Sequence, residues 1–321
     1  NRQNRLTEHE IFVEDGFWKL NDSVYSHNYN EFVQQWMHKL KLAEKSSDQN
    51  EILRLNKLLK HLYSTDTWKA DSNLAFPKNT LLNNIAVSTD NKLKILFVCH
   101  DFPPYRYAGA QLYAKNLAQA INRSGKVHVE ILHPVFRNHD NPSGTYEKSS
   151  FEDLIVHKIY KEPNVYQLEN INSILIYGFM TNFLKNNHFD LIHFHGLGQM
   201  SASPLQVCHD LAIPSVMTLH DYWFLCDEWH LMTPDQNLCS GPDSVEKCTD
   251  CLLKYHVDPA NHAELKKAAL SYKQKRRDYL YNNFKFLKKV FAPSVFLKTI
   301  FNKYGWNNIT VDPLGFIIQN P

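Results

Sequence analysis

Residues 92–125 read KLKILFVCHDFPPYRYAGAQLYAKNLAQAINRSG, and this stretch decides the fold. It begins with a short apolar run of the kind that is buried on both faces of a parallel sheet. A loop rich in proline and glycine follows, and the apolar residues after it have helical spacing up to Gly125. Strand, loop and helix in this order predict the first unit of a parallel sheet covered by helices.

The same alternation continues to the end of the chain. Strand-like runs are VHVEIL (127–132), LIVHKIY (154–160), DLIHFH (190–195), PSVMTL (214–219), KVFAPS (289–294) and ITVDP (309–313). Helical patterns near 167–187, 203–211 and 261–287, and another that ends at Tyr304, separate them. The alternation predicts an α/β fold, a Rossmann-like doubly wound parallel sheet with right-handed crossovers. A long polar loop is expected between VHVEIL and LIVHKIY.

Residues 1–90 have a different pattern, in which two apolar repeats of helical spacing flank the polar segment EKSSDQN (44–50). The repeats are Phe32, Trp36 and Leu40, then Ile52, Leu55, Leu59 and Leu62. We therefore expect a small, hairpin-like helical region over 1–90, serving packing or spacing rather than catalysis. The Rossmann-like domain is expected to span 91–313, with a cysteine-rich loop at 222–258.

The bulk composition limits the function classes. Of the 321 residues, 43% are hydrophobic and 21% charged, and the net charge is +2. This balance is ordinary for a globular protein and argues against a dedicated nucleic-acid binder, which would be strongly basic. No apolar run approaches the roughly 18 residues of a membrane span, and the first residues lack a signal-peptide pattern. A cytoplasmic protein is expected.

One predicted helix, 261–289, is strongly basic, with nine lysines and arginines against two acids. A solvated face explains this pattern best. The alternative is that the helix holds an anionic lipid diphosphate or associates peripherally with the inner face of a membrane.

Titratable side chains follow three of the predicted strands. They are His100 and Asp101, then His193 and His195, then His220 and Asp221. In doubly wound sheets, ligands bind beyond the carboxyl ends of the strands, so these side chains predict a functional cleft. His193 and His195 alternate with Phe194 and therefore share a face. His195 is the better cleft residue because it is nearer the strand end, and packing explains His193 at least as well.

Several segments, in order, resemble the N-terminal half of a retaining GT-B glycosyltransferase of family 4. KILFVCHDFPPYRYAGAQLYAKNLAQAI (94–121) resembles that family's opening strand, proline-rich loop, glycine turn and helix. FDLIHFHG (189–196), IPSVMTLHDYWFLC (213–226), VFAPSVFLKTIFNKYG (290–305) and ITVDPLGF (309–316) resemble its later motifs. The resemblance covers about residues 92–316. It implies transfer of a sugar from a nucleotide-diphosphate sugar to a saccharide or lipid-linked acceptor, in surface polysaccharide or glycoconjugate synthesis.

The chain departs from this family at two places. The usual pair of glycines in the first loop reads Ala108-Gly109, where Gly109 would let a backbone N–H approach the donor diphosphate. A plain strand-to-helix turn is the alternative. The family's donor-binding domain would begin where this chain ends, at PLGFIIQNP (313–321), so residues 314–321 are expected to begin an interdomain linker. The chain alone, as a truncated acceptor half, is expected to be inactive.

The resemblance also implies roles for individual residues. His220 matches the histidine that contacts the donor sugar near the reacting carbon, where an imidazole can bind a hydroxyl or stabilise positive charge. Asp221 would orient the loop or accept a hydrogen bond from the acceptor substrate. The alternative is that it caps the turn after the strand. Tyr105 and Arg106 would meet the acceptor or the phosphates, although a solvated Arg106 explains the sequence equally well. No catalytic metal is expected.

A cysteine cluster interrupts the pattern, with CTDC at 248–251 in the spacing typical of structural zinc sites. Its members are Cys226, Cys239, Cys248 and Cys251. Four thiolates would hold a structural Zn²⁺ with no open position, and the metal would staple a long loop with little secondary structure of its own. Disulfides or free thiols are the alternatives, and His230 can replace one thiolate. Cys99 and Cys208 are expected to be buried small side chains.

The same loop carries aromatic side chains, namely Tyr222, Trp223, Phe224 and Trp229. They are expected to form a small local core, with part of it, including Tyr222, offering a platform for an acceptor sugar.

Two other function classes remain open. Histidines and a carboxylate at strand ends also suit a metal-dependent hydrolase, although its later lysine, histidine and aspartate ligands are not evident in VFAPS or ITVDP. A non-catalytic, zinc-stabilised binding module is the other alternative.

Overall fold

The computed structural model describes residues 11–14, 17–20, 92–136, 144–161 and 171–315. The chain divides into two compact units, one of residues 1–74 and 259–272 and the other of residues 75–258 and 273–321. The second unit contains the main sheet.

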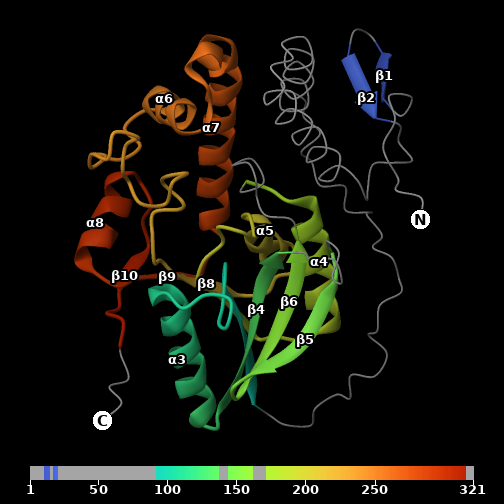
Figure 1. Cartoon of the computed structure of the whole chain (residues 1–321). Coiled ribbons are helices and arrows are strands. Elements are labelled where there is room, and N and C mark those ends of the chain that lie inside the picture. Colours follow the sequence, from blue (N-terminus) through green and yellow to red (C-terminus); the bar gives the residue numbers. More distant parts are fainter. Residues whose placement is uncertain (1–10, 15–16, 21–91, 137–143, 162–170, 316–321) are drawn as a thin grey trace. The chain divides into compact units, whose positions relative to one another are not determined.

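Eight strands form this sheet, in the order β10-β9-β8-β7-β3-β4-β6-β5 (Figure 1). They are β3 (Leu93–Val98), β4 (Val127–Phe136), β5 (Tyr146–Phe151), β6 (Leu154–Lys161), β7 (Leu191–Phe194), β8 (Ser215–Thr218), β9 (Lys289–Ala292) and β10 (Ile309–Val311). Every neighbouring pair is parallel except β5 and β6. The predicted α/β class and the Rossmann-like, mostly parallel sheet are therefore confirmed.

The helices that follow the strands lie near their predicted positions. They are α3 (Gly109–Arg123), α4 (Ile174–Asn186), α5 (Ser203–Asp210), α7 (His262–Phe284) and α8 (Val295–Lys303). The predicted basic helix 261–289 is thus five residues shorter at its C-terminal end. The backbone N–H groups of Phe286 and Leu287 donate to the carbonyls of Asn283 and Phe284, each three residues back, and these turns end the helix before β9 begins.

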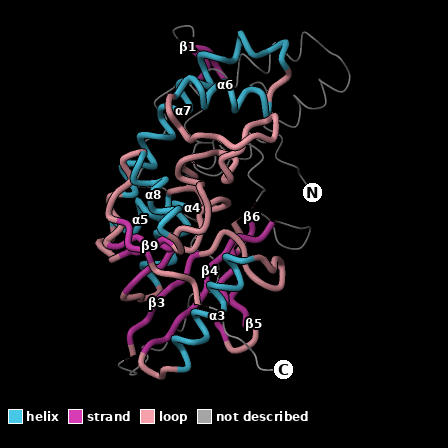
Figure 2. The backbone as a smooth tube through the Cα atoms, turned by 90° about the vertical axis from the view of Figure 1, so that its left-hand side faces the viewer, coloured by secondary structure: helices cyan, strands magenta, loops and turns pink. Residues whose placement is uncertain are grey.

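Helices cover both faces of the sheet, as the continuous apolar strands predicted (Figure 2). On one face, Phe97 of β3 packs in a cluster with Ala114 and Ala118 of α3. On the other, Leu96 and Val98 pack in a second cluster with residues of α4 and α5. Alternate residues of β3 therefore enter opposite clusters, and each is fully buried.

The strand order reverses direction beside β3. From β3 the chain goes to β4 and then outward to β6, whereas β7 returns to the other side of β3 and the chain continues outward to β10. The pairing of Val98 with Phe194 brings the ends of β3 and β7 together. This reversal is the switch point at which doubly wound sheets bind ligands.

Two elements differ from the predictions. The expected polar loop contains β5, whose side chains are half-buried or exposed and which lies at the sheet edge. An edge strand buries little apolar surface, so it carries no apolar signature. The cysteine-rich loop contains α6 (Val245–His256), capped by Ser244 and continued by a short 3₁₀ turn (Pro259–Asn261). The expectation of little secondary structure there was wrong.

Of the N-terminal region, the structure describes only β1 (Ile11–Glu14) and β2 (Phe17–Leu20), an antiparallel pair. The helices predicted between Phe32 and Leu62 lie outside the described residues, and the domain boundaries stay predictions. Among the helices that are described, none has both the length and the apolar character needed to cross a membrane.

Candidate functional site

Three histidines from two neighbouring strand ends lie together at the switch point. The ring centroids of His193 and His195 are 4.1 Å apart, and those of His195 and His220 are 5.7 Å apart. The Nδ1 of His195 lies 3.4 Å from the Nε2 of His220, and the Nε2 of His193 lies 2.9 Å from the Thr218 hydroxyl. His195 is positioned by its backbone N–H, which donates to Val98 of β3. The predicted pair His195 and His220 is thus brought together.

The first turns of α3 face this cluster. The ring of Tyr113 lies 5.9 Å from that of His195 and 5.5 Å from that of His220. Gly109, the predicted phosphate contact, is the first residue of the same helix. The histidine cluster and the N-terminus of α3 therefore line one region.

Burial keeps these imidazoles neutral. Desolvation and the charge of His220 lower the pKa of His193 to about 3. The pKa of His220 falls to about 4 through desolvation and the charge of His100, and that of His195 lies well below its usual value for similar reasons. Near neutral pH the cluster therefore offers uncharged hydrogen-bonding groups, each ring having one donor and one acceptor nitrogen.

The start of α3 is open to a ligand. Gly109 is exposed, and a Cβ added there would meet no other atom within 4 Å. Ala108 precedes the helix in an extended conformation, with φ −132° and ψ 173°, and no side chain caps the helix. Neither position needs a glycine for the fold, and the first N–H groups of α3 are placed to receive an anion.

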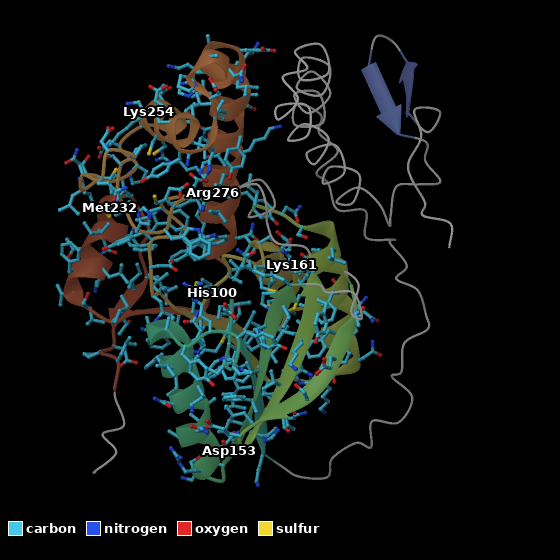
Figure 3. The ribbon with its side chains drawn as sticks, viewed as in Figure 1. His100, Asp153, Lys161, Met232, Lys254 and Arg276 are labelled. Atoms are coloured by element: carbon cyan, nitrogen blue, oxygen red, sulfur yellow. The ribbon has the colours of Figure 1, made fainter. Side chains whose placement is uncertain are left out.

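A partly buried pair that the sequence analysis missed supports this turn; its histidine, His100, is labelled in Figure 3. Gln111, in the first turn of α3, donates from its Nε2 to the Nε2 of His100 at 2.8 Å. Burial, followed by the charge of Arg106, lowers the pKa of His100 to about 4, so its ring can accept this bond. Gln111 is only 3% exposed. Its place in the first helical turn was the only sequence signal available.

The two aspartates at the strand ends bind backbone groups. The Oδ1 of Asp221 accepts from the Trp223 N–H at 2.9 Å, and the Oδ1 of Asp101 accepts from the Phe102 N–H at 2.9 Å. Burial raises the pKa of Asp221 to about 6, although the Trp223 bond opposes this. The geometry matches the turn-capping alternative for Asp221.

Tyr105 and Arg106 lie on the loop between β3 and α3, and both are exposed. Their backbone N–H groups donate to the carbonyl of the fully buried Phe102, at 3.1 and 3.3 Å. The loop is therefore anchored through its backbone, while both residues remain largely exposed.

The aromatic part of the cysteine-rich loop packs on the strand ends. Trp229 contacts His100 edge to face, with centroids 5.8 Å apart, and a Cβ added at Gly198 would lie 2.4 Å from its indole. Trp223 and Phe224 are buried in the main core, and Tyr222 and Trp229 pack against it while half-buried. The predicted local core is thus part of the main core.

A buried ion-pair network ties this loop to α7 (Figure 3). Asp227 pairs with Lys273 and also with Arg276, whose Nε lies 3.1 Å from Oδ1. Arg276 also donates to the carbonyl oxygen of Trp223.

The four cysteines of the loop line one cavity of about 410 Å³, and their thiols are free. The Sγ of Cys239 accepts from the Gly241 N–H at 3.4 Å, and desolvation raises the pKa of the Cys226, Cys248 and Cys251 thiols. Throughout the described part of the chain, no three His, Cys, Asp or Glu side chains are grouped to hold a metal ion. The predicted four-thiolate zinc site is therefore not supported. His230 is exposed, and Cys99 and Cys208 are buried as predicted.

The sequence model of Glycosyltransferase Family 4 matches residues 107–318, about two thirds of the chain. The chain belongs to this family. No curated protein matches this family 4 chain significantly.

Solved structures similar to this family 4 chain include two enzymes. The catalytic domain of starch synthase IV from Arabidopsis thaliana, bound to ADP and acarbose, is 15% identical, with a TM-score of 0.39 over 70% of this chain and 52% of that one. The α,α-trehalose 6-phosphate synthase from Burkholderia multivorans is 10% identical, with a TM-score of 0.33 over 66% of this chain and 42% of that one. The chain thus spans about half the length of these structures.

Proposed function

We propose that this chain is the acceptor-binding half of a retaining GT-B glycosyltransferase. It would act with a donor-binding domain to move a sugar from a nucleotide-diphosphate sugar to a saccharide or lipid-linked acceptor. Membership of family 4 supports sugar transfer in general. The observation that carries the proposal is the contact of Tyr113 on α3 with both His195 and His220. This contact places the N-terminus of α3, whose free N–H groups can bind phosphate, beside neutral imidazoles.

The chemistry needed is mostly positioning and charge stabilisation, since the leaving group is a diphosphate. The first N–H groups of α3, beside Gly109, would bind diphosphate oxygens. The neutral imidazole of His220 would hydrogen-bond a donor-sugar hydroxyl, and His195 would hold the ring of His220 through their nitrogen contact. Asp221 would hold the turn that carries His220.

The wider context follows the family resemblance. We propose a role in surface polysaccharide or glycoconjugate synthesis, carried out in the cytoplasm. The basic helix α7 would carry any contact with an inner membrane surface, and its many lysines and arginines support this.

The test supplies a donor-binding domain to the full chain and measures binding and transfer with UDP-glucose, GDP-mannose and ADP-glucose. We expect His220→Ala to weaken binding of the preferred donor by about tenfold, the effect of losing one good hydrogen bond in a buried site. His188→Ala, whose side chain is 82% exposed, is the matched control. If no nucleotide sugar binds when that domain is supplied, or if His220→Ala then binds as the wild type does, the assignment fails.

The alternatives predict other results. Donor binding without transfer, even when a donor-binding domain is supplied, would indicate the non-catalytic module. The metal-dependent hydrolase has little support: although three histidines lie together there, no group of three His, Cys, Asp or Glu side chains among the described residues is placed to hold a metal ion.

A further inference from the structure

Tyr105 presents an aromatic ring that is held in place although half of the residue is exposed. The residue is 52% exposed, on the loop that follows β3. Its backbone is anchored to Phe102, and its ring lies 5.7 Å from that of the buried His133 of β4. A large exposed aromatic side chain with a fixed position is typical of a binding surface.

A group of three polar side chains from β5 and β6 lies beside this ring. The Lys158 ammonium lies 5.7 Å from the ring centroid, and both Lys158 and Tyr160 interact electrostatically with Tyr105. Both partners bind Glu147, Lys158 through its Nζ at 2.8 Å and Tyr160 through its hydroxyl at 2.6 Å. The four side chains form one network, which we call the Tyr105 network. The orientation of the Tyr105 ring is therefore set before any ligand binds.

The charges of this network are balanced. The hydrogen bond from Lys158 lowers the pKa of Glu147. Desolvation, the largest single effect, would lower the pKa of Lys158, but the Glu147 bond and the nearby charges of Tyr105 and Glu147 together raise it. Both groups are therefore ionised near neutral pH and neutralise one another. Such a pair offers donors and acceptors to hydroxyl groups, whereas a phosphate would be repelled by the carboxylate.

The network lies at the ligand-binding edge of the sheet. Tyr105 follows the end of β3, and Lys158 and Tyr160 lie in the last residues of β6, which ends at Lys161 (Figure 3). β3, β4 and β6 are parallel, so their carboxyl ends share an edge with the histidine cluster.

We propose that the Tyr105 network is a saccharide subsite, in which an uncharged sugar ring of the acceptor stacks on Tyr105 while its hydroxyls bind Lys158 and Glu147. The inference rests on the proposed function and narrows the acceptor to one with a neutral sugar at its receiving end. Aromatic stacking combined with charge-paired hydrogen bonds suits a sugar, which has apolar C–H faces and a polar rim.

The test is saturation-transfer NMR and titration of the full chain with methyl α-D-glucopyranoside, methyl α-D-mannopyranoside, N-acetylglucosamine and glucose 1-phosphate. We expect at least one neutral sugar to bind more tightly than glucose 1-phosphate. Tyr105→Ala should weaken that binding by about tenfold, and Tyr105→Phe, which keeps the ring, by about threefold or less. Lys158→Met should weaken it to a similar extent as Tyr105→Ala. Tyr281→Ala, which removes another exposed tyrosine, is the control.

The outcomes separate this inference from the proposed function. Equal sugar binding by wild type and Tyr105→Ala, or preference for glucose 1-phosphate, overturns the subsite. Binding of nucleotide sugar without any neutral-sugar binding overturns the subsite alone. Neutral-sugar binding that depends on Tyr105, without nucleotide-sugar binding, supports the subsite and removes the transferase assignment. Melting curves verify that each variant is folded.

Discussion

At the scale of single residues, burial decides the protonation state of the cleft. His193, His195 and His220 lie within a few ångströms of one another, and each protonated ring would have to lose its hydration and face like charge. The three rings remain neutral for this reason.

Acid should therefore destabilise this chain as pH falls below about 6.5, the pKa of an unfolded histidine. Six buried or half-buried histidines have lowered pKa values: His100, His133, His157, His193, His195 and His220. As pH falls, the unfolded state binds protons at these histidines before the folded state does. Each histidine therefore lowers the free energy of unfolding by up to about 1.4 kcal/mol per pH unit. Asp101, Asp221 and His256, whose pKa values are raised, act in the opposite direction but are fewer.

Urea unfolding at several pH values between about 7 and 5 measures this slope. We expect stability to fall with pH, and His193→Gln to make the fall shallower by up to about 1.4 kcal/mol per pH unit. His188→Gln is the control. A slope that is flat in the wild type, or that His193→Gln leaves unchanged, would contradict neutral buried imidazoles.

A substitution at Gly109 should affect donor binding without affecting the stability of the fold. Since a Cβ there meets no atom within 4 Å, Gly109→Ala should change the free energy of unfolding by no more than about 0.5 kcal/mol. The added methyl would instead obstruct a diphosphate at the first N–H groups of α3. Melting curves and titration with the preferred nucleotide sugar check both parts. A variant that binds the donor as the wild type does would remove Gly109 from the phosphate site.

At the scale of elements, the cysteine-rich loop is held by packing, by the Asp227 ion pairs and by α6. Trp229, in the left-handed conformation with φ +65°, rests on Gly198 and reaches His100. The loop therefore forms part of the wall of the cleft at the strand ends.

Gly198→Ala should disturb this wall. The new methyl would lie 2.4 Å from the Trp229 indole, so the ring must move, and we expect a loss of about 1–3 kcal/mol in stability. Trp229→Phe should recover part of the loss in the double variant, because the smaller ring leaves room for the methyl. Urea unfolding and near-UV circular dichroism follow both effects, with Gly109→Ala as a matched glycine control. Full additivity of the two changes would show that the residues do not interact.

At the scale of the whole molecule, the order of the strands places the cleft. β3, β7 and β8 are separated by long stretches of chain, yet they are consecutive in the sheet. The ends of these strands, with His100, His195 and His220, meet because the chain reverses its direction of growth between β3 and β7. The same strand order places β6, and with it Lys158, on the Tyr105 side of that reversal.

Residue patterns along the chain were enough to predict the α/β class, the strands and helices with apolar signatures, and the histidines at three strand ends. These depend on local periodicity, which neighbouring residues encode. Three features emerged only from the folded molecule: Gln111 supports His100, Tyr105 lies beside a network of β5 and β6, and the four cysteines line one cavity without forming, among the described residues, a group that could hold a metal ion. Such contacts join residues far apart in the chain, and their geometry follows from strand order and packing, which no short sequence pattern encodes. The edge strand β5 and helix α6 were missed for a related reason, because each buries too little apolar surface to show a clear period.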